Sequence, residues 1–198
     1  MKIRSIFWVA MALAGLAGAG PITFTISTTG AGTLGALTFT DATITFTQVS
    51  DTSLIGSCFG TDLCPPASTA NTVTVQGLGT FTITDSTLFF DNPGGSVGVD
   101  DTNTFIDAIS EHDAAFVSYN MQTALGPIFD SVSSPTYTGM GTSGGAFSYT
   151  GNSLDATFTA VTAVPEPGSL GLVLGGAMLG LCLRFSRGRS VCSPSAAP

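Results

Sequence analysis

Acidic and amide side chains gather between residues 91 and 113, and their types suit the binding of a hard cation. The segment DDTNTFID supplies carboxylate and amide oxygens from Asp100, Asp101, Asn103 and Asp107. Oxygen donors of this kind are the ligands that Ca²⁺ prefers in proteins. A helix-loop-helix calcium loop counted from Asp101 is not indicated, because Ile106 occupies the position that needs glycine. The segment therefore predicts either a calcium site with these four residues as ligands or a solvated acidic loop.

Two other patterns match enzyme signatures, but the segments around them do not suit the chemistry. Ser143 lies in GTSGG, the frame of a hydrolase nucleophile elbow, which needs a helix after it and a histidine later in the chain. Here the strand-like AFSYT follows, and the single histidine, His112, comes earlier. GAGTLG, beginning at Gly30, matches a dinucleotide fingerprint but leads into the strand-like ALTFTDATITF, where a helix is needed. We therefore expect no catalytic residues, no enzyme activity and no cofactor apart from the Ca²⁺ considered above.

Two of the four cysteines lie close together in a turn-rich segment. Cys58 and Cys64 belong to GSCFGTDLCPP, where glycine, aspartate and proline surround them. Two thiols without a nearby histidine are too few for a zinc site, whereas an oxidising compartment favours a short-loop disulfide. The segment predicts a disulfide between Cys58 and Cys64.

The distribution of charge excludes a nucleic-acid partner. Twelve of the thirteen acids lie between Asp41 and Asp155, where there is no lysine or arginine, so this stretch has a formal charge of −12. Phosphate binding needs a basic patch, which is missing there. The basic residues lie near the two ends of the chain, at Lys2, Arg4, Arg184, Arg187 and Arg189. Such an acidic middle segment, rich in threonine, glycine and serine, is typical of an exported domain kept soluble by self-repulsion.

The elements that must position these residues are strands, because large apolar residues alternate with threonine along the middle segment. ITFTIST places Ile22, Phe24 and Ile26 on one face, and the same period returns in ATITFTQV, NTVTVQG, GTFTIT and DATFTAV. About eight or nine short strands with turn residues between them predict an all-β fold. We expect one antiparallel β-sandwich or jelly roll over residues 20–163.

Two places depart from this regular alternation. Large apolar residues occupy odd-numbered positions before Asp41 (Leu37, Phe39) and even-numbered positions after Ala42 (Ile44, Phe46). We therefore expect a turn or bulge at Asp41 and Ala42 and no continuous strand. From Thr104, TFIDAISEHDAAF spaces apolar residues at intervals typical of a helix, which predicts one short helix or turn.

Both ends of the chain carry features of export. Residues 1–19 have a basic start, an apolar run and Ala17 and Ala19 in an A-x-A arrangement, which predicts a cleaved signal peptide. Near the other end, residues 168–183 carry no charge, and as a helix they cover roughly 24 Å. The three arginines that follow, Arg184, Arg187 and Arg189, predict a stop on the cytoplasmic side. Residues 190–198 then form a cytoplasmic tail.

The segment from Val164 to Arg189 resembles the PEP-CTERM sorting signal of Gram-negative bacteria. The motif Val164, Pro165, Glu166, Pro167 is followed by the apolar run and then by the arginine cluster, all in the family's order. The resemblance implies an inner-membrane anchor, processing by an exosortase, and transfer of residues 20–163 to the cell surface or the extracellular space. It also implies an association with exopolysaccharide and biofilm.

The sequence thus predicts a structural or adhesive surface protein with no enzyme activity. Its expected partners are an exosortase, the membrane before processing, and exopolysaccharide. The alternative is a carbohydrate- or calcium-binding β-sandwich module that uses the region from residue 91 to 113.

Overall fold

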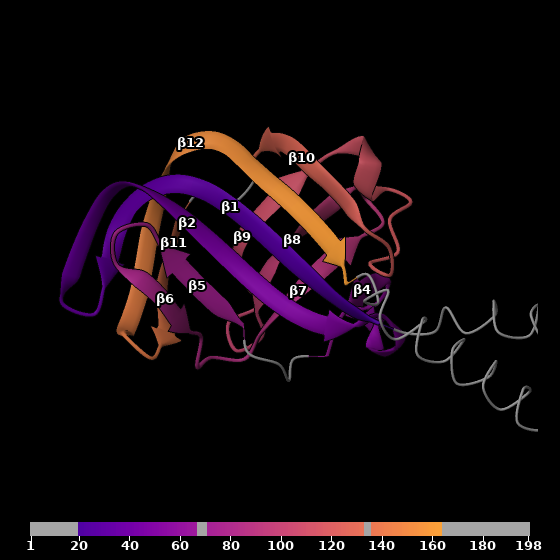
Figure 1. Cartoon of the computed structure of the whole chain (residues 1–198), viewed down its shortest axis with the longest axis horizontal. Helices are drawn as coiled ribbons and strands as arrows, with labels where there is room; N and C mark the ends of the chain where they lie inside the picture. The colour runs from indigo at the N-terminus through magenta and orange to yellow at the C-terminus, as the bar shows by residue number, and fades with distance from the viewer. Residues whose placement is uncertain (1–19, 67–70, 133–135, 164–198) are drawn as a thin grey trace, which may run out of the picture. The chain divides into compact units, whose positions relative to one another are not determined.

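The computed structural model describes residues 20–66, 71–132 and 136–163 (Figure 1). The chain separates into two compact units, Met1–Ala163 and Val164–Pro198, and every described residue belongs to the first. The expected signal peptide, sorting signal and cytoplasmic tail lie outside the described residues. Among the residues that the structure does describe, no helix has the length and apolar character of a membrane span.

The larger of two sheets has seven strands in the order β10-β12-β1-β2-β5-β6, and β11 also pairs with β12. All of its pairings are antiparallel. Its strands are β1 (Pro21–Leu34), β2 (Leu37–Asp51), β5 (Thr72–Val75), β6 (Gly79–Thr82), β10 (Leu125–Ser131), β11 (Thr136–Thr142) and β12 (Gly145–Thr162).

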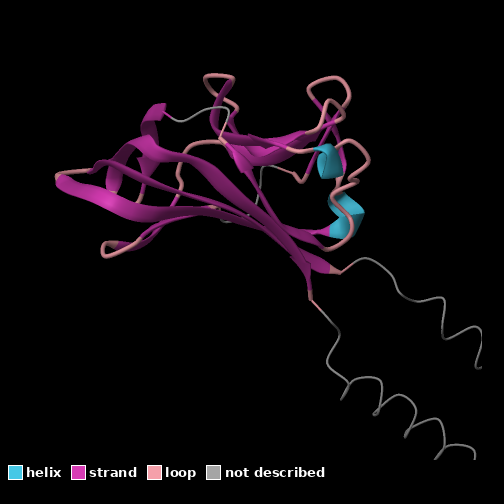
Figure 2. Cartoon of the chain, turned by 90° about the horizontal axis from the view of Figure 1, so that it is seen from above, coloured by secondary structure: helices cyan, strands magenta, loops and turns pink. Residues whose placement is uncertain are grey.

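The smaller sheet has five antiparallel strands in the order β3-β4-β7-β8-β9. These are β3 (Gly56–Cys58), β4 (Asp62–Cys64), β7 (Thr87–Asn92), β8 (Ser96–Asp101) and β9 (Ile106–His112). Two short 3₁₀ helices, η1 (Thr52–Leu54) and η2 (Ala114–Phe116), complete the described elements. Figure 2 shows the smaller sheet as a layer over part of the larger one, with both 3₁₀ helices at one end.

The core lies between the sheets and follows from the alternation in the sequence. Ile22, Phe24 and Ile26 on β1 are fully buried, while the residues between them are partly exposed. Phe158 on β12 packs edge to face against Phe116 of η2, with ring centroids 5.4 Å apart. Burial of apolar side chains from both layers holds the sheets together, and the predicted all-β fold with two antiparallel sheets is confirmed.

A polar link also joins the two sheets inside the core. Gln48, fully buried on β2, accepts a hydrogen bond from the Phe89 backbone N–H of β7 at 2.8 Å. Its amide nitrogen donates to the Pro66 carbonyl at 3.3 Å. Because both ends of the amide are paired, this buried polar group does not carry an unmet hydrogen-bonding cost.

The bulge expected at Asp41 is present, but the strand does not stop there. β2 continues to Asp51, and the register against β1 shifts opposite Ala31, between the pairs Phe39–Gly32 and Ala42–Gly30. Asp41 has a φ of 50°, in the left-handed region that a bulge residue can adopt. Because the bulge adds one residue to β2, the odd-numbered Phe39 and the even-numbered Ile44 point to the same side of the sheet, and both are buried in the core.

The short helix or turn expected from Thr104 is wrong for most of that segment, because residues 106–112 form β9; only residues 104–105 lie in a turn and residues 114–116 in η2. The register against β8 shifts between the pairs Val99–Ile109 and Asp100–Asp107, which leaves Ala108 as an extra residue. This bulge buries Ala108 and Ile109 side by side, and two adjacent apolar residues suggested a helical period. The number and length of the strands also differ from the eight or nine short strands expected. The described residues contain twelve strands, and β1, β2 and β12 are long.

The two ends of this domain lie together. Ile22 pairs with Thr162, and the Ala163 N–H donates to the Pro21 carbonyl at 2.9 Å. The described chain therefore enters and leaves the larger sheet on neighbouring strands, β1 and β12 (Figure 1).

Candidate functional site

A pocket of about 310 Å³ lies on the face of the smaller sheet that points away from the core. Alternation along the strands places its residues there: Phe89, Val97 and Val99 belong to the core, so their neighbours point outward. The lining residues come from β7, β8, β9 and the β3–β4 hairpin: Phe90, Asn92, Ser96, Asp100, Asp107, Phe59 and Asp62. Three of these seven side chains are carboxylates.

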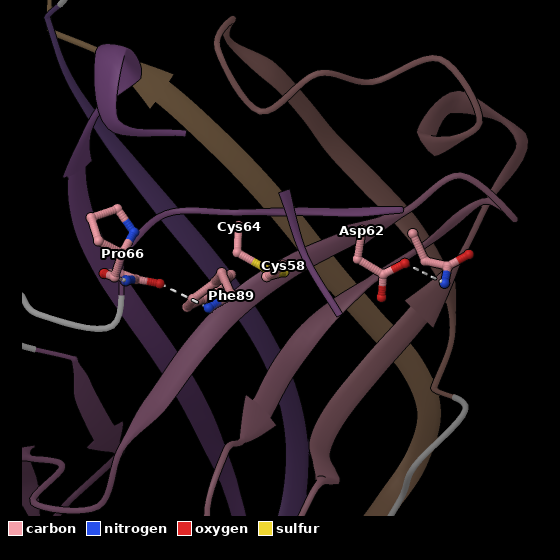
Figure 3. Close-up of a disulfide and its surroundings, with 7 residues drawn as sticks. Cys58, Asp62, Cys64, Pro66 and Phe89 are labelled. Atoms are coloured by element: carbon pink, nitrogen blue, oxygen red, sulfur yellow. Dashed lines mark hydrogen bonds between the residues drawn. A yellow bond between two sulfur atoms is a disulfide. The ribbon is translucent and has the colours of Figure 1, made fainter. Parts of the chain in front are cut away.

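The β3–β4 hairpin forms one wall of the pocket. A disulfide joins Cys58 and Cys64, whose Cα atoms lie 5.8 Å apart, across the hairpin (Figure 3). Cys64 packs with Leu88 and Phe90 in a small apolar cluster on this outer face. The disulfide therefore closes the hairpin that carries Phe59 in its turn and Asp62 at the start of β4, and the packing of Cys64 on Leu88 and Phe90 holds it against the sheet.

Asp62 is tied to the sheet by a hydrogen bond. It accepts from the Asn92 side-chain nitrogen at 2.8 Å (Figure 3). The Asn92 side-chain oxygen in turn accepts from the Gly94 backbone N–H at 2.7 Å. The Asn92 amide is thus engaged at both ends, and it positions the Asp62 carboxylate at the pocket.

Two exposed phenylalanines stand beside the pocket. Phe59 and Phe105 are 45% and 72% exposed, and their rings meet edge to face at 5.9 Å between centroids. Both have positive φ, 27° and 54° respectively, in a region that bulky residues rarely adopt. Strained backbone and exposed aromatic side chains in one place are typical of binding sites.

Burial raises the pKa of all three pocket carboxylates, and neighbouring acids add to the effect for Asp100 and Asp107. Burial, followed by the charges of Asp107 and Asp101, raises the pKa of Asp100. Burial also raises the pKa of Asp107, and the charge of Asp62 adds to the effect. Burial raises the pKa of Asp62 as well, against the opposing hydrogen bond from Asn92. Since residues 5–183 contain no lysine or arginine, no such cation from this domain balances the three acids.

The four predicted calcium ligands do not come together. Asp100 and Asp107 are directly paired across β8 and β9 and both line the pocket. Asp101 points to the opposite face, where it accepts a hydrogen bond from the buried Tyr137 hydroxyl. Asn103 is exposed in the following turn, and its backbone N–H donates to Asp101 at 2.9 Å. Within the described ranges, no three His, Cys, Asp or Glu residues are grouped as metal ligands.

Two further acids are buried inside the domain, and nothing in the alternation pattern distinguished them beforehand. Asp91 is 2% exposed, and Glu111 is fully buried. Burial raises the pKa of each to about 7. Among the described residues, neither Glu111 carboxylate oxygen has a hydrogen-bond partner. Both acids are therefore costly to ionise where they lie.

The residues of the enzyme-like patterns have structural partners. Ser143 Oγ accepts from the Thr82 backbone N–H at 3.1 Å, and His112 Nδ1 pairs with Ser96 Oγ at 2.9 Å. GAGTLG lies at the end of β1, and Gly35, with a φ of 59°, forms the turn into β2. Gly30 and Gly32 are therefore strand residues of β1, and only Gly35 serves the hairpin turn.

A second candidate surface is the outer side of the larger sheet, which we call the hydroxyl face. Ten threonine and serine side chains form two rows across five neighbouring strands. One row contains Thr159, Thr25, Thr47, Thr72 and Thr82, and the other contains Thr157, Ser27, Thr45, Thr74 and Thr80. All ten are partly or fully exposed, and none is charged.

The spacing of the hydroxyl face follows from sheet geometry. Neighbouring strands lie about 4.8 Å apart, and residues two apart on one strand lie about 6.7 Å apart. In one row, Thr74 Oγ1 and Thr80 Oγ1 are hydrogen-bonded at 2.8 Å, and in the other, Thr25 Oγ1 donates to the Thr159 backbone carbonyl at 3.3 Å. Phe129 on β10 is 70% exposed and pairs with Thr157 on β12, so it extends this face beyond β12.

Comparison of the chain with protein-family models, curated proteins and solved structures found no match.

Proposed function

We propose that this chain is an exported bacterial surface protein, without enzyme activity, whose β-sandwich contacts neutral exopolysaccharide through the hydroxyl face. The two register-matched rows across β12, β1, β2, β5 and β6 are the observation that supports the contact. Each hydroxyl can both donate and accept a hydrogen bond, as can each hydroxyl of a sugar.

Many weak contacts add up when a polymer lies along such a surface. A single hydrogen bond to a neutral hydroxyl contributes little, but ten hydroxyls within one face can engage a repeating chain together. The exposed Phe129 ring beside the rows adds an apolar surface on which a sugar can stack. The twelve acids of the domain oppose binding of acidic polymers, so a neutral polysaccharide is the favoured partner.

Delivery to the surface is the second part of the proposal. A signal peptide at residues 1–19 exports the chain, and residues 164–189 hold it in the inner membrane until an exosortase cleaves at or near the motif. Support comes from the order of the motif, the apolar run and the arginines in the sequence. Residues 20–163 then reach the cell surface or the extracellular matrix, in a biofilm context.

Substitution of hydroxyls by methyl groups tests the contact. Thr25, Thr47 and Thr72 are changed together to valine, which keeps the shape and the strand preference of threonine. The full-length protein should sediment with cellulose but not with alginate, and the triple variant should lose most of that binding. A control triple variant at exposed positions outside the rows, Thr123, Thr136 and Thr138 to valine, should bind normally. Equal binding by both variants would contradict the proposal.

Two epitope tags test the delivery. One tag follows Pro198 and the other lies in an exposed turn of the domain, and the protein is expressed with and without an exosortase. The C-terminal tag should be lost from the surface form only when the enzyme and intact Pro165, Glu166 and Pro167 are both present. Recovery of extracellular protein that still carries Arg184–Arg189 would refute the sorting route.

A further inference from the structure

We propose that the acidic pocket is a binding site for a small organic cation, an ammonium group carried on an aliphatic body. The site is formed by Asp62, Asp100 and Asp107, with Phe59 and Phe90 as its apolar walls. It is distinct from the hydroxyl face, which lies on the other sheet.

An unpartnered buried oxygen on a residue that lines the pocket is the first observation that points to a ligand. Asp100 is 7% exposed, lines the pocket, and its Oδ1 has no hydrogen-bond partner among the described residues. A buried carboxylate oxygen without a partner costs free energy that a donor from a ligand removes. Asp107, its direct neighbour across the strands, carries the same charge and makes the unliganded arrangement worse.

The polar groups of the pocket determine which ligand chemistry fits. The side-chain amide of Asn92 is already engaged, because it donates to Asp62 and accepts from Gly94. The Ser96 hydroxyl is likewise hydrogen-bonded to His112. What remains is mainly the accepting capacity of three carboxylates. The pocket therefore needs a ligand that donates hydrogen bonds and carries positive charge, which excludes anions and disfavours neutral sugars.

The walls favour an organic cation over a metal ion. Calcium takes six to eight oxygen ligands, and within the described residues the acids are not grouped as metal ligands. Phe90 at the floor and Phe59 in the hairpin turn offer ring surface instead. Aromatic rings attract alkylammonium groups by cation–π interaction and bury their methylene groups.

The size of the pocket limits the ligand further. A volume of about 310 Å³ accommodates one small molecule and is too small for several sugar rings. Two or three carboxylates around such a space match a short diamine, whose two ammonium groups can each reach an acid.

Titration calorimetry on the full-length chain, purified with its disulfide intact in a neutral detergent, tests the proposal. The probes are 1,4-diaminobutane, tetramethylammonium, CaCl₂ and glucose, each at low ionic strength. We expect saturable binding of 1,4-diaminobutane, weaker binding of tetramethylammonium, and no saturable binding of glucose. Asp100→Asn should weaken diamine binding at least tenfold, and Phe59→Ala should weaken it severalfold.

Asp41→Asn is the matched control, because it removes one exposed acid from the bulge of β2 on the other sheet and asparagine tolerates positive φ. It should bind the diamine like the unmodified chain. If Asp100→Asn fails to fold, Asp107→Asn provides the second test of the same pocket, with folding checked by circular dichroism. Absence of diamine binding, tighter binding of Ca²⁺ than of the diamine, or equal affinity in Asp100→Asn and Asp41→Asn would each overturn the proposal.

Discussion

At the scale of single residues, the position of each acid on its strand decides its role. Asp100 and Asp101 are neighbours in the chain, yet one lines a pocket and the other bonds Tyr137 in the interior. For Asp101, burial raises the pKa, but the hydrogen bonds from Tyr137 and from the Asn103 backbone outweigh it, so the pKa lies below its usual value. For the buried Glu111 the effect of burial prevails, and its pKa is raised to about 7.

Glu111 should make the domain less stable as the pH rises. Its pKa is about 7 in the folded state, above the ordinary 4.5, so its contribution is fully present below pH 4.5 and is lost as the pH passes through 7. A rise of this size corresponds to about 3 kcal/mol. Urea unfolding at pH 5 and pH 8 should therefore show lower stability at pH 8.

Two variants separate this effect from the general charge of the domain. Glu111→Gln cannot ionise, so its free energy of unfolding should change less between pH 5 and pH 8. Asp41→Asn, which removes an exposed acid, should keep the dependence of the unmodified chain. A Glu111→Gln variant with an undiminished pH dependence would show that another group is responsible.

At the scale of elements, the β3–β4 hairpin has little structure of its own. Each strand has three residues, and β4 pairs with β7 through the single residue pair Leu63–Asp91. The disulfide joins the two strands of the hairpin, while the packing of Cys64 on Leu88 and Phe90 and the Asn92–Asp62 hydrogen bond attach the hairpin to the sheet. The shape of this pocket wall therefore depends on the disulfide together with these few contacts.

Replacing both Cys58 and Cys64 with serine should lower stability by about 2 kcal/mol, because the disulfide closes a short loop in the unfolded chain. The larger sheet should persist, since its strands do not involve the hairpin. Urea unfolding measures the first effect, and circular dichroism the second. The same loss should follow from reducing the unmodified protein with dithiothreitol. If stability is unchanged, the disulfide does not restrain the hairpin.

At the scale of the whole molecule, unbalanced negative charge opposes folding. Twelve acids and no lysine or arginine lie between Asp41 and Asp155. Mutual repulsion of like charges destabilises a compact chain, and salt screens it over about 10 Å at 0.1 M. The melting temperature should therefore rise by several degrees between 10 mM and 300 mM NaCl.

A neutral osmolyte separates screening from solvent effects. Glycine betaine carries no net charge and does not screen the acids. At equal osmolarity it should therefore raise the melting temperature less than NaCl does. A melting temperature that is independent of salt, or that falls with salt, would show that the acids are not in net repulsion.

Much of the fold was predictable from local pattern. Alternation placed Ile22, Phe24, Ile26, Ile44 and Phe46 in the core, where all are fully buried. The bulge at Asp41 was also visible, because a change of parity needs an extra residue. The bulge in β9 was not, since Ala108 and Ile109 together suggest a helix as readily as a strand.

The sequence by itself determined the strand character of the domain and its acidic charge, because these depend on residue type and local spacing alone. Only the tertiary structure decided that Asp62 joins Asp100 and Asp107, that Asp101 turns inward, and that ten hydroxyls align across five strands. These arrangements depend on strand order and register between distant segments. Pairing free energy is shared among many such contacts, so no single local stretch specifies them.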